Sequence, residues 1–160
     1  MQLADQPNGG NMNGETRIRP MVEPDAEAVA KLATELGYPN EIAAIRSRIR
    51  AIGETDLLLV AADVRQKPVA FIQAHRVCII EVGFRVEILG LVVSSIARRK
   101  GIARSLIEEV ERWASEIGAE VVSVRSNIKR GEAHLFYPAM GYKHIKTQAV
   151  YEKRRERSEK

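Results

Sequence analysis

The chain has 160 residues, of which 45% are apolar, a formal net charge of +4 and one cysteine, Cys78. This length predicts one domain with a real hydrophobic core, and a single cysteine excludes an internal disulfide. No apolar run is long enough to span a bilayer, and the polar start lacks the pattern of a signal peptide. We therefore expect a cytoplasmic protein that makes no membrane contact.

The first half of the chain predicts a polar lead followed by alternating strands and helices. Residues 1–15 are rich in Asn, Gly and Gln, which is typical of a disordered lead. Apolar periodicity then predicts the ordered elements. These are a strand at 16–20, helices at 24–36 and 41–52, and strands at 57–62 and 69–77. The segment 78–84 fits either an extended strand or a loop, and we expect Cys78 to pack in the sheet as a small apolar group.

The central stretch, residues 86–104, joins a strand to a helix through a basic turn. Branched apolar residues predominate in 86–93, which favours a strand, and Ser94-Ser95 breaks it. Apolar positions then recur at helical spacing from Ile102 to Ile117. The first turn of a helix has N–H groups without internal partners and lies at the positive end of the helix dipole. Gly101 also lets the backbone approach a ligand closely. The turn is therefore a candidate cradle for phosphate.

The second half predicts a further strand at 119–126, a short helix at 132–137 and a hairpin at 142–153. The strands at 86–93 and 119–126 flank one helix and should therefore be parallel. The fold class is α/β, with a mixed, mostly antiparallel central sheet, a parallel β-α-β crossover and helices on both faces. We expect one domain over 16–153 and a charged tail at 154–160.

Two motifs resemble those of the GNAT superfamily, the acyl-CoA-dependent N-acetyltransferases. The cradle sequence Arg98-x-x-Gly101-x-Ala103 is similar to that family's Arg/Gln-x-x-Gly-x-Gly/Ala signature, whereas the Walker and dinucleotide patterns are absent. The stretch from Asn127 through Phe136-Tyr137 to Gly141-Tyr142 resembles the family's Asn…Ala-x-x-Phe-Tyr-x-x-x-Gly-Phe. The resemblance covers about 16–153. Without it, the basic turn would equally fit a solvated helix cap.

The resemblance implies acetyl transfer from acetyl-CoA to a primary amine by direct attack in a ternary complex. It implies that the backbone at 91–93 contacts the pantetheine and the thioester oxygen, that 98–104 hold the pyrophosphate, and that Asn127 contacts the pantetheine arm. The residues thereby expected to bind acetyl-CoA are Leu91, Val92, Val93, Arg98, Arg99, Lys100, Gly101, Ile102, Ala103, Arg104 and Asn127.

Tyr137 is the candidate proton donor. A phenol has an ordinary pKa of about 10, so it stays protonated at neutral pH and can donate to a departing thiolate. The alternative is a half-buried tyrosine that bonds a carbonyl. Pro138 disfavours helical geometry at the residue before it, which predicts a distorted helix end at Tyr137.

Glu87 is the candidate base. Strict alternation would place Glu87, Leu89, Leu91 and Val93 on one face of the central strand, where a carboxylate needs a partner or a wet cleft. In several branches of the family a glutamate lies at this distance before the cradle arginine. The alternative is an ion pair with Arg85, Arg76 or an arginine of the helix at 41–52. Glu81 and an ordered water are further candidates for the base.

Other kinds of site find little support. His75, His134 and His144 are scattered and lack zinc-ligand spacing, so we expect no metal. No local pattern indicates a Ser-His-Asp or Cys-His constellation. A non-catalytic acyl-CoA sensor remains an alternative function.

Partners are only partly constrained by the sequence. A basic nucleic-acid-binding module is less favoured, because no aromatic residue interleaves the basic runs. Polyamine, aminoglycoside, amino-acid and protein-lysine acceptors all stay open, as does a homodimer.

Overall fold

The computed structural model describes residues 16–127 and 130–155. The chain divides into two compact units, residues 1–125 and 126–160, and each is described here by itself. The expected disordered lead at 1–15 lies outside the described residues, as do residues 156–160 of the expected charged tail.

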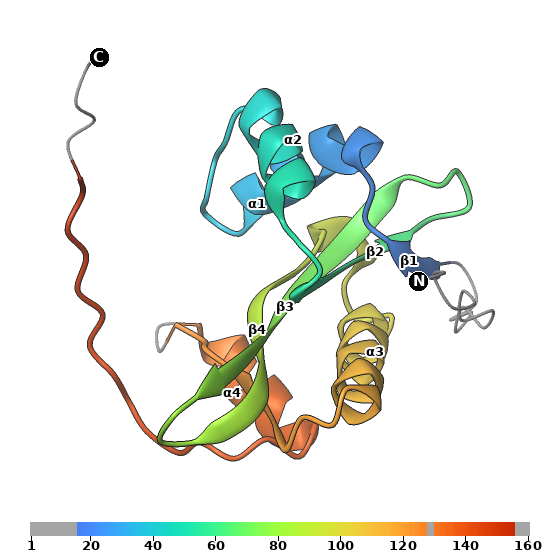
Figure 1. Cartoon of the computed structure of the whole chain (residues 1–160). Helices are drawn as coiled ribbons and strands as arrows, with labels where there is room; N and C mark the ends of the chain where they lie inside the picture. The colour runs from blue at the N-terminus through green and yellow to red at the C-terminus, as the bar shows by residue number, and fades with distance from the viewer. Residues whose placement is uncertain (1–15, 128–129, 156–160) are drawn as a thin grey trace. The chain divides into compact units, whose positions relative to one another are not determined.

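The first unit contains a five-stranded sheet (Figure 1). Its strands are β1 (Arg17–Pro20), β2 (Asp56–Ala62), β3 (Pro68–Ile79), β4 (Gly83–Val93) and β5 (Val121–Val124), in the spatial order β1-β2-β3-β4-β5. The first four strands pair antiparallel, and β5 pairs parallel with β4. The predicted mixed sheet with one parallel crossover is thus confirmed.

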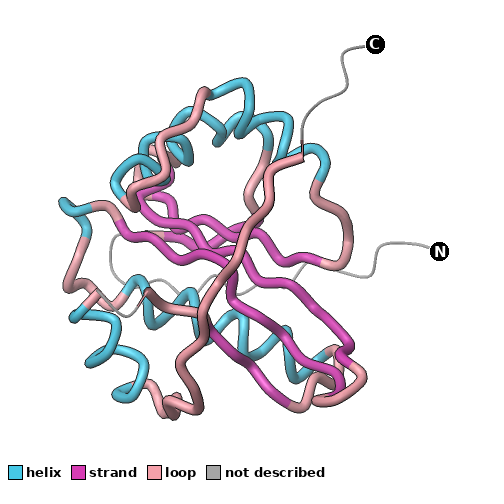
Figure 2. Tube along the Cα trace, turned by 90° about the vertical axis from the view of Figure 1, so that its left-hand side faces the viewer, coloured by secondary structure: helices cyan, strands magenta, loops and turns pink. Residues whose placement is uncertain are grey.

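Helices cover both faces of this sheet (Figure 2). They are the short η1 (Glu23–Asp25) and η2 (Ser95–Ala97), and α1 (Ala26–Glu35), α2 (Ile42–Ala51) and α3 (Ile102–Glu116). Successive side chains of a strand point to opposite faces. On β3, Phe71 packs against the cluster under α1 and α2, whereas the next residue, Ile72, is fully buried on the opposite face.

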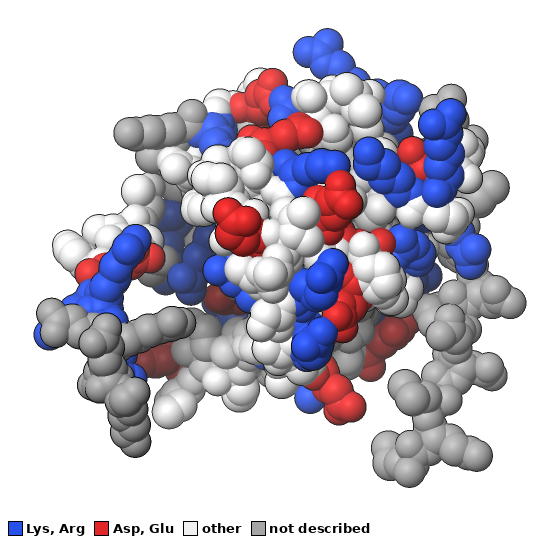
Figure 3. Space-filling model, turned by 90° about the horizontal axis from the view of Figure 1, so that it is seen from above, with Lys and Arg blue, Asp and Glu red and all other residues white. Residues whose placement is uncertain are grey.

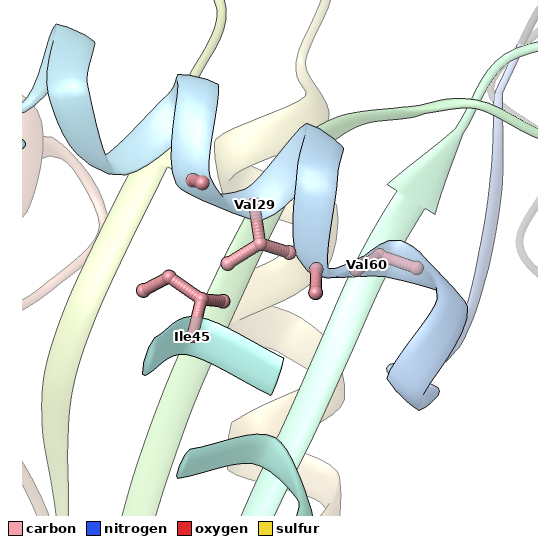
Figure 4. Packing of buried hydrophobic residues seen from close by; sticks show 5 residues of the cluster. Val29, Ile45 and Val60 are labelled. Atoms are coloured by element: carbon pink, nitrogen blue, oxygen red, sulfur yellow. The ribbon is translucent and has the colours of Figure 1, made fainter. Parts of the chain in front are cut away.

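A buried cluster fixes α1 and α2 on the sheet. Val29 of α1, Ile45 of α2 and Val60 of β2 lie together in it (Figure 4). Full burial of such a side chain stabilises the fold by about 1.5–3 kcal/mol. Residues from three segments far apart in sequence therefore determine where both helices lie.

The segment 78–84 is resolved as the end of a hairpin. Cys78 and Ile79 continue β3, and β4 begins at Gly83. Cys78 is exposed, so the expectation that it packs in the sheet is wrong. The hairpin end projects into solvent, where Ile80 is 100% exposed, and this position offers Cys78 no apolar cover.

The second unit contains α4 (Gly131–Ala139), which runs two residues further than predicted.

The predicted hairpin at 142–153 is wrong, because the structure assigns no strand to residues 142–155. Ile145, Val150 and Tyr151 are 74%, 81% and 92% exposed, so these apolar side chains bury little surface against the described residues. The segment also lacks the Gly, Pro or Asn that a tight hairpin turn usually needs.

Candidate active site

The predicted cradle forms the entrance to α3. Arg99 and Gly101 both have positive φ, at 63° and 75°, and Gly101 is the residue before the first turn of α3. Only glycine adopts this conformation without steric cost. No side chain caps the helix, so the first-turn N–H groups keep no side-chain acceptor. Arg98, Arg99, Lys100 and Arg104 are exposed around them, an arrangement that suits a phosphate.

The strand leading to the cradle outruns its parallel neighbour. The pairing of β4 with β5 ends at Ile88 opposite Val124, while β4 continues to Val93. On its other side β4 stays paired with β3 as far as Val93 opposite Ala70. The backbone from 89 to 93, which includes the predicted pantetheine positions 91–93, therefore lies beyond the paired part of β5.

A β-bulge in β4 changes the face on which Glu87 lies. Gln73 of β3 is opposite Gly90, but the next residue, Ala74, is opposite Ile88. Leu89 is thus the extra residue, and alternation shifts by one position across it. Glu87 shares a face with Gly90 and Val92, the face that α1 and α2 cover. The predicted shared face of Glu87, Leu89, Leu91 and Val93 is wrong.

Glu87 has one ion-pair partner among the described residues, which differs from those expected. Arg125 Nη2 lies 3.4 Å from Glu87 Oε2, and the side chains are 72% and 15% exposed. The expected partners Arg85, Arg76 and the arginines of α2 are not used. Arg85 lies two positions before Glu87 on the same strand, and its Nε is buried without a hydrogen-bond partner in the described part of the chain.

An aspartate–histidine pair that the sequence reasoning missed lies on the same face. Asp56 Oδ1 is 2.5 Å from His75 Nδ1, and Gln73 Nε2 donates to Asp56 Oδ2 at 2.8 Å. Burial raises the pKa of Asp56, but hydrogen bonds from His75, Gln73 and Thr55 outweigh burial and leave that pKa below its ordinary value. The pair joins residues 19 positions apart, so no local sequence motif predicts it.

A second missed contact ties α1 to the segment before the cradle. Glu35, the last residue of α1, accepts hydrogen bonds from Ser94 Oγ at 3.1 Å and from the Ser95 backbone N–H at 2.9 Å. A carboxylate at a helix C-terminus meets the negative end of the dipole, so local helix stability does not account for Glu35 at this position. Its contacts fix the start of η2, which leads into the cradle.

Tyr137 and Asn127 belong to the second unit. Tyr137 is half-buried inside α4, and its ring meets those of Phe136 and Tyr142 edge-on. The helix continues through Pro138 to Ala139, so the predicted helix end at Tyr137 is not observed. Burial raises the pKa of Tyr137, opposed by the charge of Arg130, which keeps the phenol protonated at neutral pH. The Asn127 carbonyl accepts the Arg130 N–H at 2.9 Å.

Gly141 closes α4 as predicted. Its φ is 90°, a conformation that glycine adopts without strain. The Tyr142 N–H then donates to the Tyr137 carbonyl at 3.0 Å. This turn places the Tyr142 ring beside that of Tyr137.

Three further observations concern surface charge, metal ligands and membrane-spanning helices. Seen from above, Lys and Arg are interspersed with Asp and Glu (Figure 3). Separately, the ion pairs of the first unit include Arg50 with Glu23 and Lys31 with Glu27. Within 16–127 and 130–155, no group of three or more His, Cys, Asp or Glu could hold a metal ion. In the same residues, no helix combines the length and apolar character needed to cross a membrane.

Comparison with known sequences connects this geometry to a family. A sequence model of the acetyltransferase (GNAT) domain matches residues 54–144, more than half of the chain. An aminoalkylphosphonate N-acetyltransferase of Salmonella typhimurium is 42% identical over 57 residues, which are 36% of this chain and 37% of that protein. The chain thus spans little more than a third of this relative.

Comparison with solved structures supports the fold. An aminoglycoside N-acetyltransferase in complex with CoA has a TM-score of 0.77 at 20% identity, over 93% of this chain and 99% of that chain. An aminoglycoside 6'-N-acetyltransferase from Acinetobacter baumannii has a TM-score of 0.73 at 21% identity, over 88% of this chain and 98% of that chain.

Proposed function

Because the chain belongs to the GNAT acetyltransferase family, we propose that it transfers an acetyl group from acetyl-CoA to a primary amine by direct attack in a ternary complex. The observation that carries this proposal is the uncapped, glycine-led N-terminus of α3, which follows β4 and the short η2. A family match that runs across the boundary between the two units supports one functional domain over 16–153.

The cradle and the strand before it supply the donor side of the proposal. The backbone of 98–104 binds the pyrophosphate, and its basic side chains assist through charge. The β4 backbone at 91–93 contacts the pantetheine and polarises the thioester carbonyl, and Asn127 contacts the pantetheine arm. A solved relative of the same fold holds CoA, which supports acetyl-CoA as the donor.

The chemical step removes two protons from the amine nitrogen, one before the attack and one after it, and supplies one proton to the sulfur. Amines are mostly protonated at pH 7, so a base must free the lone pair that attacks the thioester carbon. We assign this first proton transfer to Glu87. As the C–S bond breaks, Tyr137 protonates the sulfur, a role that fits a phenol kept neutral by burial. The phenolate then regains its proton by taking the second one that the attacking nitrogen loses. Holding amine and thioester together supplies much of the rate.

The acceptor is a small-molecule amine or a protein amine. The relatives named above act on aminoalkylphosphonates and aminoglycosides, which favours a small molecule. On the face seen in Figure 3, the interspersed charges do not favour a nucleic-acid surface. We place the protein in the cytoplasm, the compartment expected from its sequence.

A panel of amines scored by release of the CoA thiol tests the proposal. The panel includes aminoalkylphosphonates, aminoglycosides, polyamines, amino acids and a lysine peptide, with acetyl-CoA as the donor. Thiol release that depends on one class of amine is the expected result. Tight CoA binding by calorimetry without release on any amine would instead indicate an acyl-CoA sensor.

A further inference from the structure

A row of polar side chains crosses the sheet on the face that α1 and α2 cover. Asp56 of β2 is opposite His75 of β3, His75 is opposite Glu87 of β4, and Glu87 is opposite Ser123 of β5. Residues directly opposite one another share a face, with Cβ atoms about 4.5–5.5 Å apart. Strand pairing therefore brings an imidazole beside the carboxylate to which we assign the first proton transfer.

Asp56 fixes the protonation pattern of the His75 ring. The Asp56 side chain is 9% exposed and is held from its other oxygen by Gln73. An ionised carboxylate only accepts hydrogen bonds, so neutral His75 carries its proton on Nδ1 and keeps the lone pair on Nε2. The ring is thereby oriented as a base.

The remaining nitrogen is directed away from Asp56. Nδ1 and Nε2 flank one ring carbon and point in diverging directions, and Nδ1 is bound from the β2 side. The next side chain across the sheet is Glu87. The His75 side chain is 36% exposed, so the ring also has a route to solvent.

We propose that the Asp56–His75 pair accepts, through Glu87, the first proton that the ammonium loses before it attacks. The inference rests on the proposed function and extends it. The ammonium N–H bond breaks as a Glu87 O–H bond forms, and the freed lone pair attacks the thioester. The Glu87 side chain, which lies toward Arg125 in this structure, then turns toward His75 and passes the proton to Nε2. Asp56 balances the imidazolium charge, and solvent removes the proton between turnovers.

The chemistry of the groups favours this order. An imidazole ordinarily titrates near pH 6.5 and a glutamate carboxyl near pH 4.3, so at neutral pH an imidazole holds a proton better than a carboxylate. A base with a pKa near the working pH is also the most effective one. The charged groups facing His75 from neighbouring strands are Asp56, Glu87 and Arg85, with Arg125 following β5.

Asp56→Asn is the sharpest test because Gln73 sets the orientation of the new amide. Gln73 Nε2 now donates to Asp56 Oδ2, so it will bind the Asn carbonyl and turn the Asn NH₂ toward His75 Nδ1. Nδ1 must then accept, and the ring proton moves to Nε2. The variant keeps the shape of the site but removes the lone pair that receives the proton.

The expected result is a loss of turnover without a loss of donor binding. Asp56→Asn and His75→Gln should each lower kcat by roughly 10²-fold at pH 7, with unchanged acetyl-CoA affinity by calorimetry. The rise of kcat through the pH range of an imidazole should disappear in His75→Gln. His144→Gln, in the exposed segment after α4, is the matched control and should keep both kcat and that rise.

Nitrogen-15 NMR of the ring gives a readout independent of turnover. The ring proton of His75 should be on Nδ1 in the wild-type protein and on Nε2 in Asp56→Asn. Undiminished turnover in folded His75→Gln, or in Asp56→Asn with the ring proton moved, would overturn the inference. If wild-type protein acetylates no amine, the proposed function fails, whereas wild-type transfer that survives both substitutions contradicts only the role of the pair.

Discussion

The carboxylate of Glu35 accepts a hydrogen bond from the backbone N–H of Ser95 at 2.9 Å, linking the end of α1 to the segment that leads into the phosphate cradle. Ser94, which also donates to Glu35, is 9% exposed. A hydrogen bond to a charged group contributes about 1.5–3 kcal/mol. Glu35, at the end of α1, therefore holds in place the segment that leads into the cradle.

Removing this link should weaken acetyl-CoA binding. In Glu35→Ala the segment 94–97 loses its anchor, and we expect the Kd for acetyl-CoA to rise by roughly tenfold, about 1.4 kcal/mol. Calorimetry measures the Kd, and Glu27→Ala on the exposed side of the same helix is the control. Equal affinities in the two variants would show that the cradle holds its shape without Glu35.

Gly101→Glu should abolish CoA binding in a folded protein. The backbone at Gly101 has positive φ, and the substitution places a strained side chain and a negative charge at the phosphate position. Gly118→Glu is a useful control, because Gly118 has the same φ of 75° but ends α3. A Gly101→Glu protein that melts cooperatively and still binds CoA would refute the cradle assignment.

Tyr137→Phe separates the hydroxyl from the ring. Loss of a general acid should lower turnover by roughly 10²-fold, while the contacts of the ring with Phe136 and Tyr142 persist and acetyl-CoA affinity changes little. Single-turnover kinetics would establish that chemistry limits the rate. Near-normal turnover under those conditions assigns Tyr137 to packing.

The Arg19–Asp25 pair should govern acid stability of the first unit. Arg19 Nη1 lies 2.8 Å from Asp25 Oδ2, and the side chains of Arg19 and Asp25 are 23% and 6% exposed. Burial raises the pKa of Asp25, but hydrogen bonds from Arg19 and the Val22 N–H outweigh burial and lower that pKa overall. A lowered folded pKa gives stability that is present above the ordinary pKa of about 3.9 and is lost as pH falls through the folded value.

The same pair predicts a thermal effect. Asp25→Asn leaves the part-buried Arg19 without its carboxylate partner. This should cost less than the about 3–5 kcal/mol of breaking a fully buried pair and lower the melting temperature by roughly 5 °C. It should also flatten the acid dependence of the melting temperature. The exposed pair of Glu27 and Lys31 gives the control, since Glu27→Gln should leave the melting curve almost unchanged. Equal melting curves for the two variants would contradict the prediction.

Local patterns were sufficient for most elements of the first unit. Apolar periodicity and punctuation by Gly and Pro predicted the strands and helices up to β5, because each depends on neighbouring residues. The bulge at Leu89 could not be predicted, since alternation assumes a regular strand. That one extra residue moved Glu87 to the other face.

Side-chain contacts between strands also could not be predicted from the sequence patterns. Asp56 meets His75, and Glu87 meets Arg125, only because strand pairing sets the register. The hairpin predicted at 142–153 shows the reverse error: the segment contains the apolar residues Ile145 and Val150, but the structure assigns it no strand. The Arg98-x-x-Gly101 motif correctly indicated a glycine-led entrance to α3, because that geometry depends on neighbouring residues alone. Its phosphate-binding role stays a prediction.

Glu87→Gln tests the first proton transfer. The substitution keeps the shape and removes the base, so turnover should fall by roughly 10²-fold at pH 7 and recover at higher pH, where more amine is already neutral. The melting temperature should change little, because the partner Arg125 is 72% exposed and exposed ion pairs contribute little. Arg125→Gln breaks the same pair but retains the carboxylate, so it should lower turnover far less. A Glu87→Gln variant with a lower melting temperature and a wild-type pH–rate profile would remove Glu87 from the mechanism and pass its role to Glu81 or an ordered water.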